Sequence, residues 1–184
     1  VKNSPSTLNI VFPEVYLSEG EGRISEINKT MEEYINDNIF KEYKNSLVYV
    51  ERTVGNGKIR HGIVGMIDLE EYDFSKGSGS YVRATEGTVL ERIPPRVKIR
   101  ENAPLEIPHI MLLIDDRDLS VIEPLDSAKK SLQVAYDFAL MQDSGSIKGY
   151  FVNEAEEKRI DEALSKLADI SEFEKKYNIT GKGV

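Results

Sequence analysis

The sequence predicts a mixed α+β fold with a largely antiparallel sheet of about five or six strands and three or four helices. Two observations lead to this class. Segments rich in strand-forming residues follow one another along the chain, so neighbouring strands would mostly run antiparallel. Other segments carry apolar residues at three- and four-residue spacing, which is the helical period. The chain has 184 residues, the size of an ordinary domain, so we expect a single α+β domain over residues 1–184.

The amino-terminal segment begins with a short apolar run and continues into a helix. Residues 8–12, ended by Pro13, are typical of a strand or an extended lead-in. From Arg23 to about Phe40, apolar residues recur every three or four positions. This pattern predicts an amphipathic helix with a charged outer face.

A β-hairpin is the clearest local prediction. Residues 47–54 and 58–69 are rich in strand formers and flank Gly55-Asn56-Gly57. The Asn-Gly pair favours a tight turn because both residues can take positive φ. The centre of the second strand, residues 63–67, is apolar throughout, which predicts a strand internal to the sheet.

The central segment, residues 83–102, is unusually rich in arginine. Residues 89–92 could form one helical turn, which Pro94 and Pro95 interrupt before a second helix begins. In that helix Arg96 and Arg100 stand four residues apart and therefore share a face. Arginine is suited to binding phosphate or carboxylate, because its planar fork donates two parallel hydrogen bonds.

A second apolar run, residues 109–114, predicts another strand, and it is followed by Asp115 and Asp116. Carboxylates at the carboxyl end of a buried strand are a usual place for a metal or a nucleotide ribose. A plain strand-ending turn, which aspartate favours, is the alternative. The two histidines, His61 and His109, are expected at strand edges without a catalytic role.

The carboxyl-terminal part predicts helix, hairpin and helix. Residues 125–134 read as a helix capped by Asp126 or Ser127, and residues 135–141 and 147–152 as a second hairpin. Asn153 is expected to cap a long helix over residues 154–169, and Ser171 a short one over residues 171–177.

Composition narrows the function classes. The net charge of −8 argues against a general nucleic-acid coat. There are no cysteines and only two histidines, so disulfides, a thiol nucleophile and a histidine-rich zinc site are not expected. No apolar run approaches the length of about 20 residues that spans a membrane, and we expect a cytoplasmic protein.

Five segments carry a family resemblance that covers essentially the whole chain. The chain resembles the bacterial domain-of-unknown-function family numbered ten-fifteen at residues 62–73, 83–88, 91–96, 106–116 and 147–150. Many members carry a His-Glu-x-Thr motif. The matching residues here are Thr85, Glu86 and Thr88, so the histidine is replaced and its proton-transfer role is not carried over.

The resemblance implies a distant likeness to the ParB-like fold, which includes nucleotide-using proteins and the free serine kinases. In that group a downstream Asp-Gly-(His/Asn)-His motif helps to form the site. This chain has no such motif, and residues 179–184 resemble the segment just before it. We therefore expect an internal fragment of a longer protein that carries part of the site.

Three hypotheses follow for the central segment. The first is a nucleotide-dependent phosphotransferase that uses a nucleotide with magnesium. Its ligand-binding residues are Arg83, Arg92, Arg96 and Arg100, and its catalytic residues are Glu86, as base or metal ligand, and Thr88, as hydroxyl donor.

The second hypothesis is a non-catalytic regulatory module that binds a small anion or a protein, with self-association and a weaker DNA-binding branch left open. In the third, the arginines pair one to one with Glu86, Glu91 and Glu101 in a structural network. The sequence does not decide whether catalysis occurs.

Overall fold

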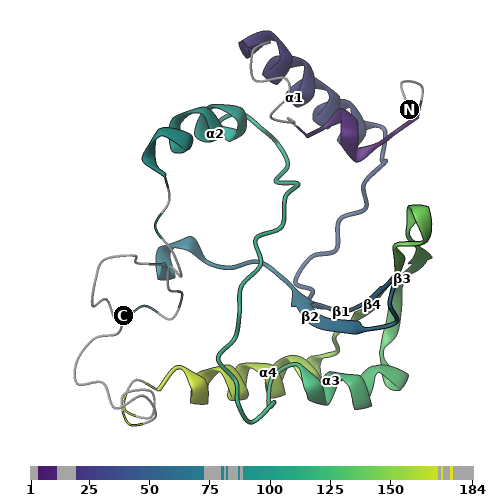
Figure 1. Cartoon of the computed structure of the whole chain (residues 1–184), viewed down its shortest axis with the longest axis vertical. Helices are drawn as coiled ribbons and strands as arrows, with labels where there is room; N and C mark the ends of the chain where they lie inside the picture. Colours follow the sequence, from purple (N-terminus) through teal and green to yellow (C-terminus); the bar gives the residue numbers. More distant parts are fainter. Residues whose placement is uncertain are drawn as a thin grey trace. The chain divides into compact units, whose positions relative to one another are not determined.

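The computed structural model describes residues 4–11, 20–72, 80, 82, 87, 89–169, 171 and 175 (Figure 1). The chain divides into two compact units, each with a hydrophobic core of its own. One unit comprises Val1–Tyr43 with Thr85–Leu113, and the other comprises Lys44–Ala84 with Ile114–Val184. The single domain expected over residues 1–184 stays a prediction.

The second unit is built on a four-stranded antiparallel sheet with the strand order β2-β1-β4-β3. Strands β1 (Val48–Val54) and β2 (Ile59–Val64) form the first predicted hairpin, and β3 (Gln133–Ala139) and β4 (Gly145–Phe151) form the second. The hairpins join through β1 and β4, where Tyr49 lies opposite Tyr150. The α+β class and the antiparallel sheet are therefore confirmed.

Two expectations about this sheet are wrong. The described part of the chain contributes four strands to it, where five or six were expected. Strand β2 is an edge strand and not an internal one, because β1 pairs with β4 on its other side. The apolar residues 65–67 that suggested burial lie beyond the end of β2 at Val64.

Two apolar runs that predicted strands form none. Residues 109–114 lie outside any regular element, and Met111 and Leu113 are exposed. In the other run, of which residues 8–11 are described, the chain makes the short 3₁₀ helix η1 (Thr7–Asn9), where the Ser6 hydroxyl accepts from the Leu8 N–H. Strand propensity reports only that a side chain suits a pleated surface, and a strand also needs a neighbour with which to pair.

The first hairpin turn uses a different geometry from the one expected. In the loop Gly55-Asn56-Gly57, which the structure describes in full, positive φ occurs at Gly57 (81°) and not at Asn56. The Val54 N–H donates to the Lys58 carbonyl at 2.9 Å, and the Gly57 N–H to the Val54 carbonyl at 2.8 Å. This is a three-residue loop closed by one left-handed residue, which glycine adopts without a steric penalty.

Helices α3 (Glu123–Ala128) and α4 (Glu154–Leu167) lie on the same side of the sheet (Figure 1). The predicted cap of α4 is confirmed, because the Asn153 side chain accepts from the Glu156 N–H at 3.0 Å. Helix α3 begins earlier than expected and has Pro124 in its first turn, so neither Asp126 nor Ser127 caps it. A 3₁₀ turn, η5 (Lys129–Ser131), ends this helical segment before β3.

The core of the second unit lies between the sheet and these helices. Its buried residues are Tyr49, Val121, Leu125, Leu132, Tyr150, Val152, Ile160 and Ala163. Leu125 of α3 and Tyr49 of β1 are fully buried. Helix α3 is thus held against β1, and this contact places the polar residues of α3 over the sheet.

The first unit is helical. Helix α1 (Gly20–Asn36) confirms the predicted amphipathic helix, and its Ile27 and Met31 are buried together with Ile10. A 3₁₀ turn, η4 (Leu90–Arg92), leads directly into α2 (Ile93–Arg100), whose first turn contains the two prolines. Four α-helices are thus described, within the range expected. The helix predicted over residues 171–177 lies largely outside the described residues.

Among the residues with a described placement, no helix combines the length and the apolar character that crossing a membrane requires.

Candidate functional site

The arginines predicted to bind a ligand are placed in part by the structure. Arg92, Arg96 and Arg100 stand on η4 and α2, which form one continuous helical run, and all three are exposed. Four-residue spacing sets them on one side of the run, each about 6 Å along the axis from the next. We call these three residues the arginine row. Arg83, Glu86 and Thr88 lie outside the described residues.

The arginine row has one ion pair whose geometry is known. The Arg100 guanidinium lies 3.1 Å from the Glu106 carboxylate, and the two side chains are 47% and 54% exposed. Glu106 is not among the glutamates that the structural hypothesis named. An ion pair this exposed contributes little stability, about 0–1 kcal/mol, so another anion can replace it at low cost.

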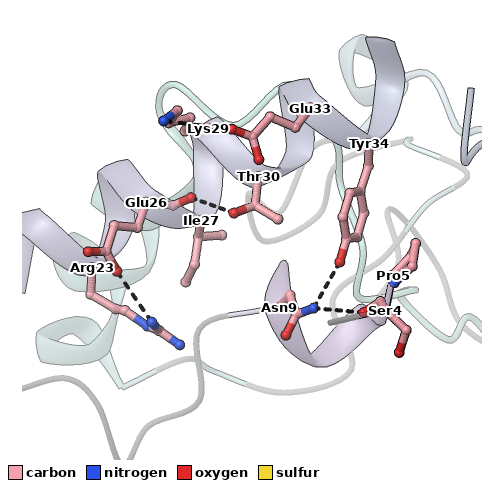
Figure 2. Close-up of a pocket in the computed structure, with 10 residues that line it drawn as sticks. All are labelled: Ser4, Pro5, Asn9, Arg23, Glu26, Ile27, Lys29, Thr30, Glu33 and Tyr34. Atoms are coloured by element: carbon pink, nitrogen blue, oxygen red, sulfur yellow. Dashed lines mark hydrogen bonds and ion pairs between the residues drawn. The ribbon is translucent and has the colours of Figure 1, made fainter. Parts of the chain in front are cut away.

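A pocket of about 600 Å³ lies in the first unit between α1 and the segment that includes η1 (Figure 2). Its charged residues form pairs, Arg23 with Glu26 at 3.3 Å and Lys29 with Glu33 at 3.7 Å. The Tyr34 hydroxyl accepts from the Ser6 N–H and from the Asn9 amide. Positive and negative side chains balance in this pocket, so it has no marked preference for an anion.

Asp116 has a structural role. Its carboxylate accepts from the Ser120 N–H at 2.6 Å, from the Ser120 hydroxyl at 3.1 Å and from the Val121 N–H at 2.8 Å. Arg159 of α4 donates to the Ser120 and Val121 carbonyls of the same segment. These bonds fix the turn that leads into α3, which supports the turn interpretation of this carboxylate over a ligand site.

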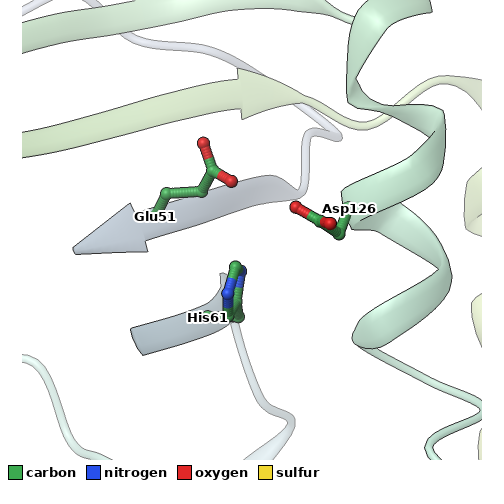
Figure 3. A group of neighbouring side chains, drawn as sticks. All are labelled: Glu51, His61 and Asp126. Carbon is green, nitrogen blue, oxygen red and sulfur yellow. The ribbon is translucent and has the colours of Figure 1, made fainter. Parts of the chain in front are cut away.

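A second group of polar side chains lies in the second unit, where α3 covers the sheet. We call it the sheet cluster, and it consists of Tyr49, Glu51, His61, Asp126, Lys129 and Tyr150. The residues come from β1, β2, β4, α3 and η5. Glu51 and His61 are directly opposite each other in the β1–β2 pair, and Asp126 points toward them from α3 (Figure 3).

Lys129 links the two carboxylates of the sheet cluster. Its Nζ lies 2.5 Å from Glu51 Oε1 and 2.7 Å from Asp126 Oδ1. The Glu51 side chain is only 11% exposed, and its other oxygen accepts from the Tyr150 hydroxyl at 3.3 Å. A carboxylate so poorly hydrated depends on these two partners for its stability as an anion.

His61 is held by the buried Tyr49. The Tyr49 hydroxyl lies 2.6 Å from His61 Nδ1, and the two rings are stacked with a 12° angle between their planes. Tyr49 is fully buried, whereas His61 is exposed on the edge strand β2. The bond at Nδ1 therefore leaves Nε2 as the ring nitrogen available to a ligand.

Electrostatics in the sheet cluster favour a cation. The hydrogen bonds that Lys129 donates to Asp126 and then to Glu51 raise the pKa of its ammonium, so it stays charged. The hydrogen bond from Lys129 lowers the pKa of Asp126, so this group stays ionised. Two carboxylates and one ammonium sum to a charge of −1 when His61 is neutral. Phosphate is therefore disfavoured here. Lys129 is also no candidate nucleophile, because that role requires a lowered pKa.

Tyr49 gives the sheet cluster a dependence on alkaline pH. Burial and then the negative charges of Glu51 and Asp126 raise the pKa of Tyr49 above its usual value, which is about 10. The unfolded chain thus loses this proton at lower pH than the folded chain, and the free energy of unfolding falls as pH rises above about 10. We expect Tyr49→Phe to be less stable at neutral pH, where it lacks the bond to His61. The gap to the wild type should narrow on alkaline titration.

Urea unfolding followed by circular dichroism at a series of pH values tests this prediction. Tyr136 and Tyr150 are present in both proteins, so their raised pKa values cancel in the comparison. If the free energies of unfolding of the two proteins differ by the same amount at every alkaline pH, the prediction is wrong.

The sequence predicts His61 at a strand edge and indicates no site role for the other members of the sheet cluster. Part of the signal is present in the sequence. Period-two alternation puts Tyr49 and Glu51 on one face of β1, and Asp126 and Lys129 stand three residues apart in a predicted helix. The missing information is that α3 packs across β1.

Comparison with known proteins adds one finding. The family DUF1015, described as a protein of unknown function, matches residues 1–172. No curated protein and no solved structure matches the chain. The expected likeness to the ParB-like fold stays a prediction. The match extends over nearly the whole sequence and includes both the arginine row and the sheet cluster. The chain therefore belongs to the DUF1015 family.

Proposed function

We propose that this domain binds the phosphate groups of a nucleotide-class ligand through the arginine row. The observation that carries the proposal is the alignment of Arg92, Arg96 and Arg100 on one exposed side of the η4–α2 run. Guanidinium groups bind phosphate through paired, charge-assisted hydrogen bonds. Three of them in a row offer successive contacts to a chain of phosphates.

The sheet cluster supports the assignment of phosphate to the arginine row by contrast. Its negative charge repels a phosphate, whereas the arginine row is positive. The half-exposed pair of Arg100 with Glu106 is compatible with a ligand that displaces the carboxylate. Such an exchange replaces one charge-assisted bond with another.

The finer proposal is a phosphotransferase that resembles the free serine kinases and uses a nucleotide with magnesium. Glu86 would act as metal ligand or base, and Thr88 would donate a hydroxyl, with Arg83 as a further phosphate contact. This part rests on the family resemblance, since these three residues lie outside the described structure. Cytoplasmic location is likewise part of the proposal.

Isothermal titration of the 184-residue chain with ATP, ADP, CTP and phosphoserine, with and without magnesium, tests phosphate binding. Arg96→Ala is expected to weaken the affinity about tenfold or more, because a hydrogen bond to a charged group contributes about 1.5–3 kcal/mol. Lys98→Ala is the matched control. It removes the same charge from the same helix, but Lys98 stands about 200° around the axis from Arg96.

Equal affinity of Arg96→Ala and the wild type would refute the phosphate contact. Equal weakening by Arg96→Ala and Lys98→Ala would show that only the general charge of α2 matters. Binding of nucleotide without turnover of any phosphoryl acceptor would leave the binding function standing and remove the phosphotransferase.

The ion pair between Arg100 and Glu106 favours a second candidate, a non-catalytic regulatory or protein-binding module with a structural arginine–glutamate network. Under this candidate, Glu106→Gln lowers the thermal stability and nucleotides do not bind. Under the first, Glu106→Gln strengthens phosphate binding, because the competing carboxylate is gone. The same titration therefore separates the two.

A further inference from the structure

Three side chains of metal-ligating type meet in the sheet cluster. Glu51, His61 and Asp126 come from three separate elements, and one donor atom of each lies within 4.8 Å of the others. Donors bound to one ion at about 2.1 Å lie at most about 4.2 Å apart. The three donors therefore lie close to the separation that a common ion requires, and side-chain rotation would bring them onto it.

Lys129 shows that the space between the two carboxylates accommodates a cation. Its ammonium lies within 2.7 Å of both Glu51 and Asp126. The Lys129 side chain is 27% exposed and extends from η5 at the end of α3. A flexible lysine stem that already reaches solvent can withdraw its ammonium from the site without disturbing the buried core.

We infer that Glu51, His61 and Asp126 bind a first-row divalent cation, Zn²⁺ or Mn²⁺, and that the Lys129 ammonium takes the place of that cation in the metal-free protein. One imidazole and two carboxylates suit these ions, because imidazole favours zinc and carboxylate favours manganese. The two carboxylates balance the charge of a divalent ion once the ammonium has left.

Tyr49 positions the histidine for this role. Its hydroxyl bonds to His61 Nδ1 at 2.6 Å, which leaves Nε2 as the nitrogen for a metal. Ligating histidines are usually oriented in this way through the nitrogen that does not bind the ion. Tyr150 holds the second oxygen of Glu51 and orients this carboxylate in the same manner.

The competition with Lys129 makes the inference testable. A metal has to displace an ammonium that makes two short contacts, so removal of the ammonium frees both carboxylates. Lys129→Met is therefore expected to strengthen binding about tenfold or more, whereas loss of a ligand in His61→Gln or Asp126→Asn weakens it at least about tenfold. If Lys129 is merely a structural partner of the carboxylates, Lys129→Met gains no affinity.

The experiment is calorimetric titration of the 184-residue chain with ZnCl₂ and with MnCl₂ in a non-chelating buffer. His109→Gln is the control for His61→Gln, since these are the two histidines of the chain and His109 is exposed in the other unit. One ion bound per chain, weakened by His61→Gln and not by His109→Gln, supports the site. Whichever ion binds more tightly identifies the metal class.

Absence of binding by both the wild type and Lys129→Met would overturn the inference. So would equal weakening by the two histidine variants, which would indicate surface binding only. If Lys129→Met does not fold, the metal affinities of His61→Gln and His109→Gln still show whether the ion binds at the sheet cluster. The titration uses the metal alone, so its result is independent of phosphate binding by the arginine row.

Discussion

Replacement of Lys129 with methionine is expected to lower the free energy of unfolding by about 2 kcal/mol. Methionine is similar in length and leaves no cavity, so the loss is electrostatic. The substitution removes the 2.5 Å contact between Glu51 and the ammonium, and it leaves the Glu51 carboxylate close to that of Asp126. At 11% exposure, water cannot replace the lost partner fully. Urea unfolding followed by circular dichroism measures the change, since the chain has no tryptophan.

Two further variants show whether the charge pair causes this loss. Lys130→Met removes the neighbouring, exposed lysine and should change stability by no more than about 0.5 kcal/mol. Glu51→Gln combined with Lys129→Met should be more stable than the sum of the single effects predicts, because the poorly hydrated charge of Glu51 is then absent and the remaining carboxylate, Asp126, is 53% exposed. Additive effects would contradict the proposed pairing, as would equal losses in the two lysine variants.

Replacement of Leu125 with alanine is expected to cost about 3 kcal/mol, within the range of about 2–5 kcal/mol for buried leucines. Leu125 is fully buried, with 0% of its surface exposed to solvent, and it packs in one cluster with Tyr49, Val121 and Ile160. Its removal leaves a cavity between α3 and the sheet. The same urea titration measures the loss.

Leu113→Ala is the control for Leu125→Ala, because Leu113 is 84% exposed and the same substitution there should be nearly neutral. Leu125 also precedes Asp126 on α3, so its loss should loosen the helix that carries this carboxylate. A stable Leu125→Ala variant would show that α3 is not anchored through this residue. The support of α3 for the sheet cluster would then need another explanation.

Two regions of opposite charge thus stand out in the described residues. The arginine row suits an anion, and the sheet cluster suits a cation. They lie in different units of the chain and are proposed on separate observations. Failure of one assignment therefore does not remove the other.

Features with a local physical cause were predictable from sequence. The Asn153 cap, the amphipathic α1 and the two hairpins depend on residues within a few positions of each other, and the structure confirms all of them. The shared face of Arg96 and Arg100 on α2 was also predictable from their four-residue spacing. The expected interruption at Pro94 and Pro95 was wrong, because η4 continues directly into α2 and adds Arg92 to the row. Residue types, spacing and turn chemistry are enough for such features, since their stabilising contacts are short in sequence.

Tertiary structure alone decided which elements meet. The apolar run at residues 109–114 has the composition of a strand but pairs with no strand in the described part of the chain, and it stays exposed. Strand β2 has an apolar end, yet the pairing of β1 with β4 makes it an edge. Glu51 and Lys129 are 78 residues apart and meet because α3 packs over β1. Such contacts depend on how complete hydrophobic faces fit together, and no local pattern in the chain encodes that fit.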